Sequence, residues 1–152
     1  MKEFFRTTGV VLLALIIAGF LANSAAADME RPFKFKSVGQ STAVNEVCSL
    51  FEESGQATHL GKFSASTTAC ICGADADYVY WCGEGVTTAA NGDKLFLYVL
   101  GKTSYAGVPA KGTIETTGGT GRFEGAEGLT EYLQIYTAPG IYTNSGSGWA
   151  SY

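Results

Sequence analysis

Hydrophobic and polar residues alternate along most of the chain after residue 28. In residues 31–37, for example, Phe33 and Phe35 fall on one face while Lys34 and Lys36 fall on the other. Comparable segments recur at residues 42–51, 57–71, 77–88, 94–100, 111–117, 129–137 and 145–152. No segment shows the 3.6-residue period of an amphipathic helix together with its caps. The pattern therefore predicts an all-β protein.

The predicted strands follow one another with short connections and without a helical crossover. About eight antiparallel strands close readily into a barrel, which removes exposed edges and leaves room for side chains or one small ligand. We therefore predict an eight-stranded antiparallel β-barrel with short turns, with a two-sheet sandwich as the alternative. Asn91-Gly92 predicts a two-residue type I′ hairpin turn within this sheet.

The strand predicted at residues 94–100 is apolar on both faces, with Leu95 and Leu97 on one and Phe96, Tyr98 and Leu100 on the other. An antiparallel strand usually keeps one face in water. The second face is therefore expected to be covered, either by another subunit or by the chain's own termini. The first of these alternatives would make the protein a homo-oligomer.

The first 27 residues have the anatomy of a secretory signal peptide. Lys2 and Arg6 precede an apolar run at residues 9–22, and three alanines stand before Asp28. The run is shorter than the roughly 20 apolar residues of a membrane-spanning helix. We predict cleavage, export to the periplasm or the cell exterior, and one domain at residues 28–152 that is not held at a membrane. An uncleaved N-terminal anchor is the alternative.

The predicted mature chain is acidic, with 8 basic and 13 acidic residues. This balance disfavours nucleic acid as a partner, because nucleic-acid binding needs a basic surface. The frequent aromatic residues indicate a folded chain rather than a disordered one.

The four cysteines all lie after residue 28, and an even number in an exported chain predicts two disulfides among three connectivities. If a turn is centred near Asp77, Cys72 faces Cys82 across a hairpin, and Cys48 is left with Cys70. The alternative is a zinc site that uses the thiolates, with or without His59. The spacing lacks C-x-x-C pairs, so we predict no metal and no other cofactor.

Residues 118–128, GGTGRFEGAEG, hold five glycines in eleven positions. They match neither a P-loop nor a dinucleotide-binding fingerprint, because no Lys-Ser/Thr follows and no helix pattern begins there. We predict a structural turn between two strands, built on Gly118, Gly119, Gly121, Gly125 and Gly128.

The same segment resembles the G-G-T/S-G-x-F-x-G-x-x-G segment of the allene oxide cyclase barrel family, and a similar segment recurs in plant dirigent proteins. ATHLGKF at residues 57–63, ANGDKLF at 90–96 and WASY at 149–152 look like blocks of small exported bacterial proteins grouped with that barrel. The likeness runs in order over most of residues 56–152. Residues 28–54 and the four cysteines are not part of it.

The resemblance implies an eight-stranded barrel. In the plant relatives its cavity binds apolar molecules and steers cyclisation or radical coupling, and the barrels assemble through their outer surfaces. The matching residues are turn and scaffold residues, so no catalytic residue carries over to this chain.

Three functions are compatible with the sequence. We favour non-catalytic binding of a small apolar or aromatic ligand, with Tyr98, Tyr132 and Tyr136 as polar-tipped lining residues. The second is a cofactor-free isomerase or cyclase. It needs an inward carboxylate or tyrosine with a pKa shifted by burial. The mid-strand carboxylates available are Glu46, Glu115 and Glu131, whereas Glu52 and Glu53 are assigned to a solvated turn. The third is a surface structural or oligomeric interaction protein that uses an outer apolar face near Leu95 and Leu97.

Overall fold

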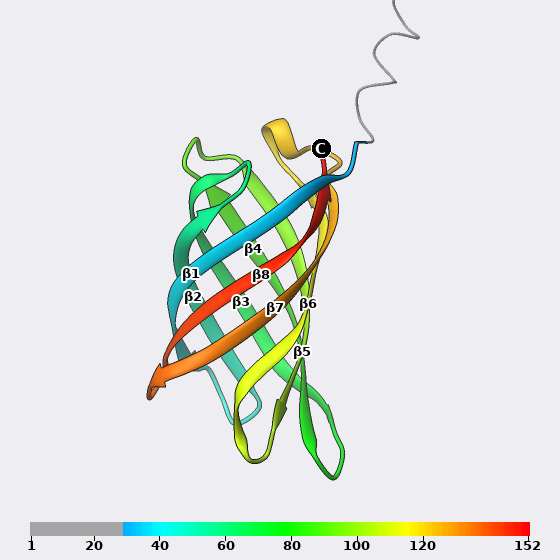
Figure 1. Ribbon diagram of the computed structural model, residues 1–152. Coiled ribbons are helices and arrows are strands. Elements are labelled where there is room, and N and C mark those ends of the chain that lie inside the picture. Colours follow the sequence, from blue (N-terminus) through cyan, green and yellow to red (C-terminus); the bar gives the residue numbers. More distant parts are fainter. Residues whose placement is uncertain (1–28) are drawn as a thin grey trace, which may run out of the picture.

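The computed structural model describes residues 29–152, apart from the side chains of residues 107 and 108. The predicted signal peptide, residues 1–27, lies outside the described residues. Eight strands and one turn of 3₁₀ helix, η1, follow one another along the chain (Figure 1). Their bounds are Arg31–Ala43 (β1), Cys48–Ala57 (β2), Gly61–Ala74 (β3), Tyr78–Ala89 (β4), Lys94–Ser104 (β5), Gly107–Gly119 (β6), Gly121–Phe123 (η1), Glu127–Ala138 (β7) and Ile141–Ser151 (β8).

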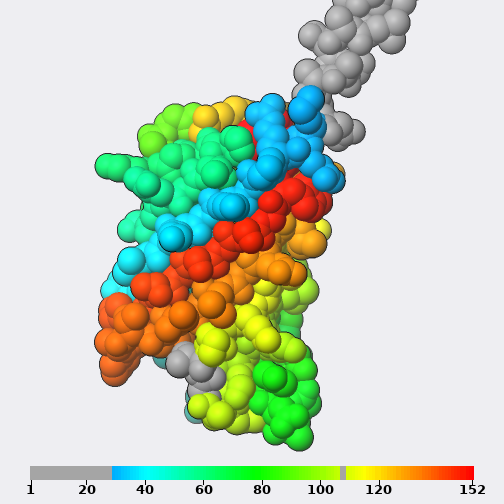
Figure 2. Space-filling model, in the orientation of Figure 1, coloured from blue at the N-terminus to red at the C-terminus, as the bar shows by residue number. Residues whose placement is uncertain are grey.

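The strands form one closed antiparallel barrel. Each strand pairs with the next, and β1 pairs with β8. Lys36 of β1 lies opposite Gln56 of β2 on one side and Ser145 of β8 on the other. Figure 2 shows β1 and β8, in blue and red, side by side across one face of the molecule. The predicted eight-stranded barrel is therefore confirmed, and the sandwich alternative is wrong.

One end of the barrel is filled with apolar side chains. η1, the C-terminus and the start of β1 gather at this end (Figure 1). Its buried residues include Phe35, Leu60, Phe63, Leu95 and Phe123. Phe123 is fully buried, at 0% exposure, and its ring meets that of Tyr152 edge to face at 5.1 Å. These residues close the end by packing and leave a small void of about 40 Å³ between them.

The glycine-rich segment forms the cap of this closed end. β6 continues to Gly119 and β7 begins at Glu127, so Gly118, Gly119 and Gly128 belong to strands and only Gly121 and Gly125 lie in the connection. Gly121 has a φ of +60°, which favours glycine. A Cβ atom there would also overlap the carboxylate of Asp93. The connection thus needs glycine for its backbone and for the approach of a neighbouring loop.

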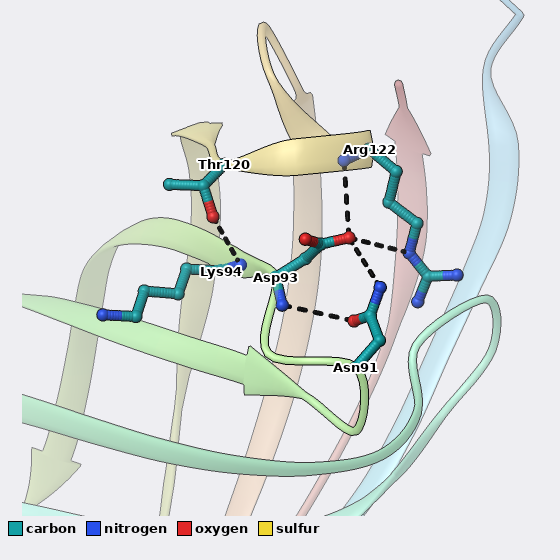
Figure 3. A network of polar contacts seen from close by, with 5 residues as sticks. All are labelled: Asn91, Asp93, Lys94, Thr120 and Arg122. Atoms are coloured by element: carbon teal, nitrogen blue, oxygen red, sulfur yellow. Dashed lines mark hydrogen bonds and ion pairs between the residues drawn. The ribbon is translucent and has the colours of Figure 1, made fainter.

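A polar network joins this connection to the loop between β4 and β5 (Figure 3). The Asp93 Oδ2 atom accepts a hydrogen bond from Asn91 Nδ2 at 2.6 Å and lies 3.8 Å from Arg122 Nε. The Lys94 N–H donates to Thr120 Oγ1 at 3.0 Å. Two segments that are distant in the sequence are thereby held together above the buried Phe123.

Two disulfides tie three consecutive strands together. Cys48–Cys70 joins β2 to β3, with a Cα–Cα distance of 4.0 Å, and Cys72–Cys82 joins β3 to β4, with a distance of 5.8 Å. The predicted pairing is confirmed, and the zinc alternative is wrong because every thiol is oxidised. Disulfides indicate a setting outside the reducing cytoplasm. Within residues 29–152, no helix has the length and apolar character needed to cross a membrane.

One predicted strand boundary and one predicted turn type are wrong. The segment predicted as one strand at residues 42–51 is divided between β1 and β2, and β2 continues to Ala57, so Glu52 and Glu53 lie within a strand and not in a turn. The reason is that the period-two pattern persists beyond Phe51. The Asn91-Gly92 turn is present but is not type I′, because Asn91 lacks the positive φ that Gly92 has at +90°. The connection spans residues 90–93 and is closed by a hydrogen bond from Ala89 N–H to Asp93 O.

The outer apolar face predicted on β5 lies on the other side of the strand. Leu95 is buried and Leu97 packs against the core, so both point into the barrel. The residues outside are Phe96 and Leu100, which are 40% and 45% exposed. Other exposed apolar residues lie on β7, namely Leu129, Leu133 and Ile135. β7 therefore turns its polar-tipped side inward and its aliphatic side outward, which is the reverse of a simple hydrophobic core.

Candidate functional site

A cavity of about 190 Å³ lies in the half of the barrel opposite the closed end. Its lining residues stand near the connections at residues 44–47, 75–77, 105–106 and 139–140. Most of the wall is apolar or aromatic, and includes Phe51, Trp81, Leu97, Val99 and Ile114. For comparison, an apolar cavity of about 150 Å³ accepts benzene. The space is therefore sufficient for one ring and a short substituent.

Glu53 is the one charged residue among the described residues that line this cavity. It points inward because it shares strand parity with Phe51, and its register partners on β1 and β3, Gly39 and Ala65, are small. Glu53 also lines the small void beside the apolar core. The carboxylate thus stands in the middle of the barrel, between the filled end and the cavity.

Two side chains hold the Glu53 carboxylate in place. Ser37 Oγ donates a hydrogen bond to Oε2 at 2.8 Å, and Asn144 Nδ2 donates to the same oxygen at 3.3 Å. Oε1 accepts no hydrogen bond from any of the described side chains. Burial raises the pKa of Glu53, and the hydrogen bonds from Ser37 and Asn144 oppose this effect. Oε1 is therefore the oxygen that remains for another molecule.

Asn144 carries a second unused acceptor in the same cluster. The residue is 8% exposed, and its Oδ1 atom is buried without a hydrogen-bond partner among the described residues. Gln134, also 8% exposed, lines the same cavity. An unpaired buried acceptor costs free energy. Because the protein encloses Asn144 Oδ1, Glu53 Oε1 is the acceptor of this cluster that a ligand can reach.

Three tyrosines complete the aromatic wall. Tyr142 is 1% exposed, and its ring meets those of Phe51 at 5.9 Å and Tyr136 at 5.8 Å. Gly39 makes room for it, since a Cβ atom there would overlap the Tyr142 phenol. Burial, with a smaller contribution from the charge of Tyr136 and of Glu53, raises the pKa of Tyr132 to about 12. Burial likewise raises the pKa of Tyr142, and the nearby Glu53 carboxylate adds to the effect. Both phenols therefore stay protonated and neutral.

Of the three tyrosines predicted to line a cavity, the structure places two in the cavity wall and one outside it. Tyr132 and Tyr136 line the cavity. Tyr98 does not line it, because it alternates with Leu97 and Val99 on β5 and shares the outer face with Phe96. The two inward tyrosines come from β7, where Thr130 and Gln134 share their inward-facing side.

The three carboxylates considered for catalysis lie outside the barrel. Glu115 and Glu131 are exposed on the outer faces of β6 and β7, and Glu46 is exposed in the connection between β1 and β2. None of them lines the cavity. The inward carboxylate is Glu53, which the sequence analysis placed in a solvated turn. The signal that could have found it is the uninterrupted alternation of Phe51, Glu53, Gly55 and Ala57 against polar neighbours.

The described residues contain no cluster of three or more His, Cys, Asp and Glu side chains that could hold a metal ion. His59 lies away from the cavity, in the turn between β2 and β3. Its Nε2 atom is 3.3 Å from the Pro32 carbonyl oxygen, and its ring packs against Tyr152. The chemistry of the site therefore rests on one carboxylate, two amides and the phenols.

A comparison of the sequence with models of known protein families finds no match, and a comparison with curated proteins finds none either.

Proposed function

We propose that this protein is an exported binding protein that holds a small apolar or aromatic ligand inside its barrel. The observation that supports the proposal is the cavity of about 190 Å³ with largely apolar walls and a few convergent polar groups. The two disulfides support a periplasmic or extracellular setting. The closed barrel also agrees with the proposed likeness to the allene oxide cyclase barrel family.

The test is binding of one-ring aromatic compounds to the wild-type protein and to a variant with a filled cavity. Ala69 is 5% exposed and lines the cavity, so Ala69→Phe places a ring in the ligand's space. Thr68→Phe adds the same ring to the exposed outer face of the same strand and is the matched control. Binding is measured by calorimetry and by the fluorescence of Trp81, which lines the cavity.

We expect at least one compound among 2-phenylethanol, phenethylamine and phenylacetate to bind the wild type. Ala69→Phe should weaken that binding more than tenfold, and Thr68→Phe should leave it unchanged. If none of the three compounds binds, or if the filled variant binds as well as the wild type, the barrel interior is not a ligand site.

A catalytic role as an isomerase or cyclase is a second candidate, and Glu53 is the observation that favours it. An inward carboxyl group with a raised pKa, beside an apolar cavity, is suited to general acid–base chemistry. The test is turnover of small apolar epoxides by the wild type and by Glu53→Gln. Turnover that the substitution leaves unchanged would contradict a catalytic role for this residue.

An interaction role is a third candidate, favoured by the exposed aliphatic residues on β7. Leu133 and Ile135 are 39% and 44% exposed and lie on the same outer face. Apolar residues gathered on one surface are typical of contact regions. Sedimentation at high protein concentration tests this role, and a strict monomer would count against assembly through that face.

A further inference from the structure

We infer that the cavity selects a small organic ammonium ion with at least one N–H bond, such as a one-ring arylalkylamine. This inference rests on the proposed ligand-binding function and names the class of ligand. It follows from three features of the same cavity: its charge, its aromatic walls and its unused hydrogen-bond acceptors.

The charge of the cavity is negative. Glu53 lines it, and no Lys, Arg or His does so among residues 29–152. The hydrogen bonds from Ser37 and Asn144 fix the carboxylate, although neither group carries a positive charge. A buried carboxylate without a cationic partner is costly, so a cation beside Glu53 is strongly favoured over an anion. The net charge of −4 over the whole chain adds a weaker attraction for cations.

The walls suit an organic cation better than a hydrated metal ion. Five aromatic residues line the cavity: Phe51, Trp81, Tyr132, Tyr136 and Tyr142. The faces of aromatic rings attract ammonium groups, and several rings around one space form the type of cage that binds such groups. A metal ion would instead need several oxygen ligands, whereas Glu53 is the only carboxylate in the wall.

The hydrogen-bond acceptors distinguish an N–H-bearing ammonium ion from a quaternary one. Glu53 Oε1 has no donor among the described side chains, and Asn144 Oδ1 is buried without one. A primary ammonium group has three donors and can serve the available Glu53 Oε1, whereas a quaternary group has none. The remaining volume fits one ring, because about 150 Å³ is enough for benzene.

The experiment compares three compounds of nearly equal shape and different charge at pH 7: phenethylamine, 2-phenylethanol and phenylacetate. We expect the amine to bind at least about tenfold more tightly than the alcohol, and the carboxylate to bind least. Phenyltrimethylammonium should bind more weakly than phenethylamine. Equal binding of amine and alcohol, or tighter binding of phenylacetate, would overturn the inference and leave the ligand-binding proposal standing. Absence of binding by all the compounds would overturn both.

Two adjacent glutamates on β2 provide matched variants. Glu53→Gln keeps the shape and the acceptor oxygen but removes the charge inside the barrel, whereas Glu52→Gln removes the same charge from the outer face. We expect Glu53→Gln to abolish the preference for the amine over the alcohol. Glu52→Gln should change neither affinity. An amine preference that survives in a folded Glu53→Gln would refute the role of this carboxylate.

A measurement on the unaltered protein covers the case in which Glu53→Gln does not fold. The amine should bind more weakly as the pH falls and Glu53 takes up a proton, while 2-phenylethanol binding should not change in parallel. The other titratable groups that face this space are the phenols of Tyr132, Tyr136 and Tyr142, and no basic side chain lines it within the described part of the chain. Parallel pH profiles for the two compounds would overturn the inference.

Discussion

Phe123 offers the sharpest test of how the barrel is closed. Phe123→Ala removes a ring that is fully buried beneath the glycine-rich cap and that packs on Tyr152. Removing a buried phenylalanine costs about 3–5 kcal/mol, and its edge-to-face partner accounts for about 0.5–1.5 kcal/mol of this. The surrounding wall is a hydrogen-bonded barrel that cannot collapse into the space, so we expect a loss of about 4 kcal/mol.

Chemical and thermal unfolding measure this loss, with Phe96→Ala as the matched control. Phe96 is the same residue type in β5 but is 40% exposed on the outer surface. We expect Phe96→Ala to lower the free energy of unfolding by only about 1–2 kcal/mol, because the exposed ring buries less apolar area than Phe123 does. For a domain of this size the Phe123 variant should unfold roughly 10–20 °C below the wild type. The reasoning is refuted if the two substitutions lower the free energy of unfolding equally.

Three further predictions follow from the cap, the disulfides and the inward carboxylate. Gly121→Ala should lower the free energy of unfolding by more than the ~1 kcal/mol expected for Gly125→Ala. Both positions have positive φ, but only at position 121 would the added Cβ atom also overlap Asp93. Equal losses in urea titrations would contradict this prediction. Replacing both cysteines of one disulfide with serine should lower the free energy of unfolding by about 3.4 kcal/mol for the disulfide between β2 and β3 and by about 2.7 kcal/mol for that between β3 and β4, as their loops of 22 and 10 residues predict. A reversed order of the two losses in denaturant titrations would count against the loop-entropy account. Burial raises the pKa of Glu53 above 4.5, so just above that pH the folded protein binds more protons than the unfolded chain. Glu53→Gln should therefore gain thermal stability relative to the wild type as the pH rises and match it most closely in acid. A stability difference between the two proteins that does not vary with pH would be inconsistent with burial of the charge.

The sequence was sufficient to predict the barrel and its disulfides because both depend on local patterns. Period-two alternation and short connections specify neighbouring antiparallel strands, and the turn near Asp77 brings Cys72 toward Cys82. The role of the glycine-rich segment was only partly predictable. That Phe123 would be buried beneath the cap depends on the approach of the loop containing Asp93, which no local pattern encodes.

The candidate site was harder to predict because it depends on which face of each strand is inside. The sequence of β7 places aliphatic residues opposite polar-tipped ones, and hydrophobicity alone would turn Leu133 and Ile135 inward. The structure turns Tyr132 and Gln134 inward instead. Similarly, the Glu52-Glu53 pair looked like the end of a strand because charged residues favour turns. Only the register of β2 between β1 and β3 shows that Glu53 is enclosed.

The pairing of β1 with β8 sets the order in which the molecule can assemble. Arg31 lies opposite Ala150, whereas the disulfides join residues only 22 and 10 positions apart. The hairpins of β2, β3 and β4 can therefore form and oxidise early, but the barrel closes only when the first and last strands meet, which is a slow, non-local step. The cavity draws its walls from strands β2 to β8, and its carboxylate is held by Ser37 of β1. Ligand binding would thus report the last event in folding, and a chain with correct disulfides could still be unable to bind.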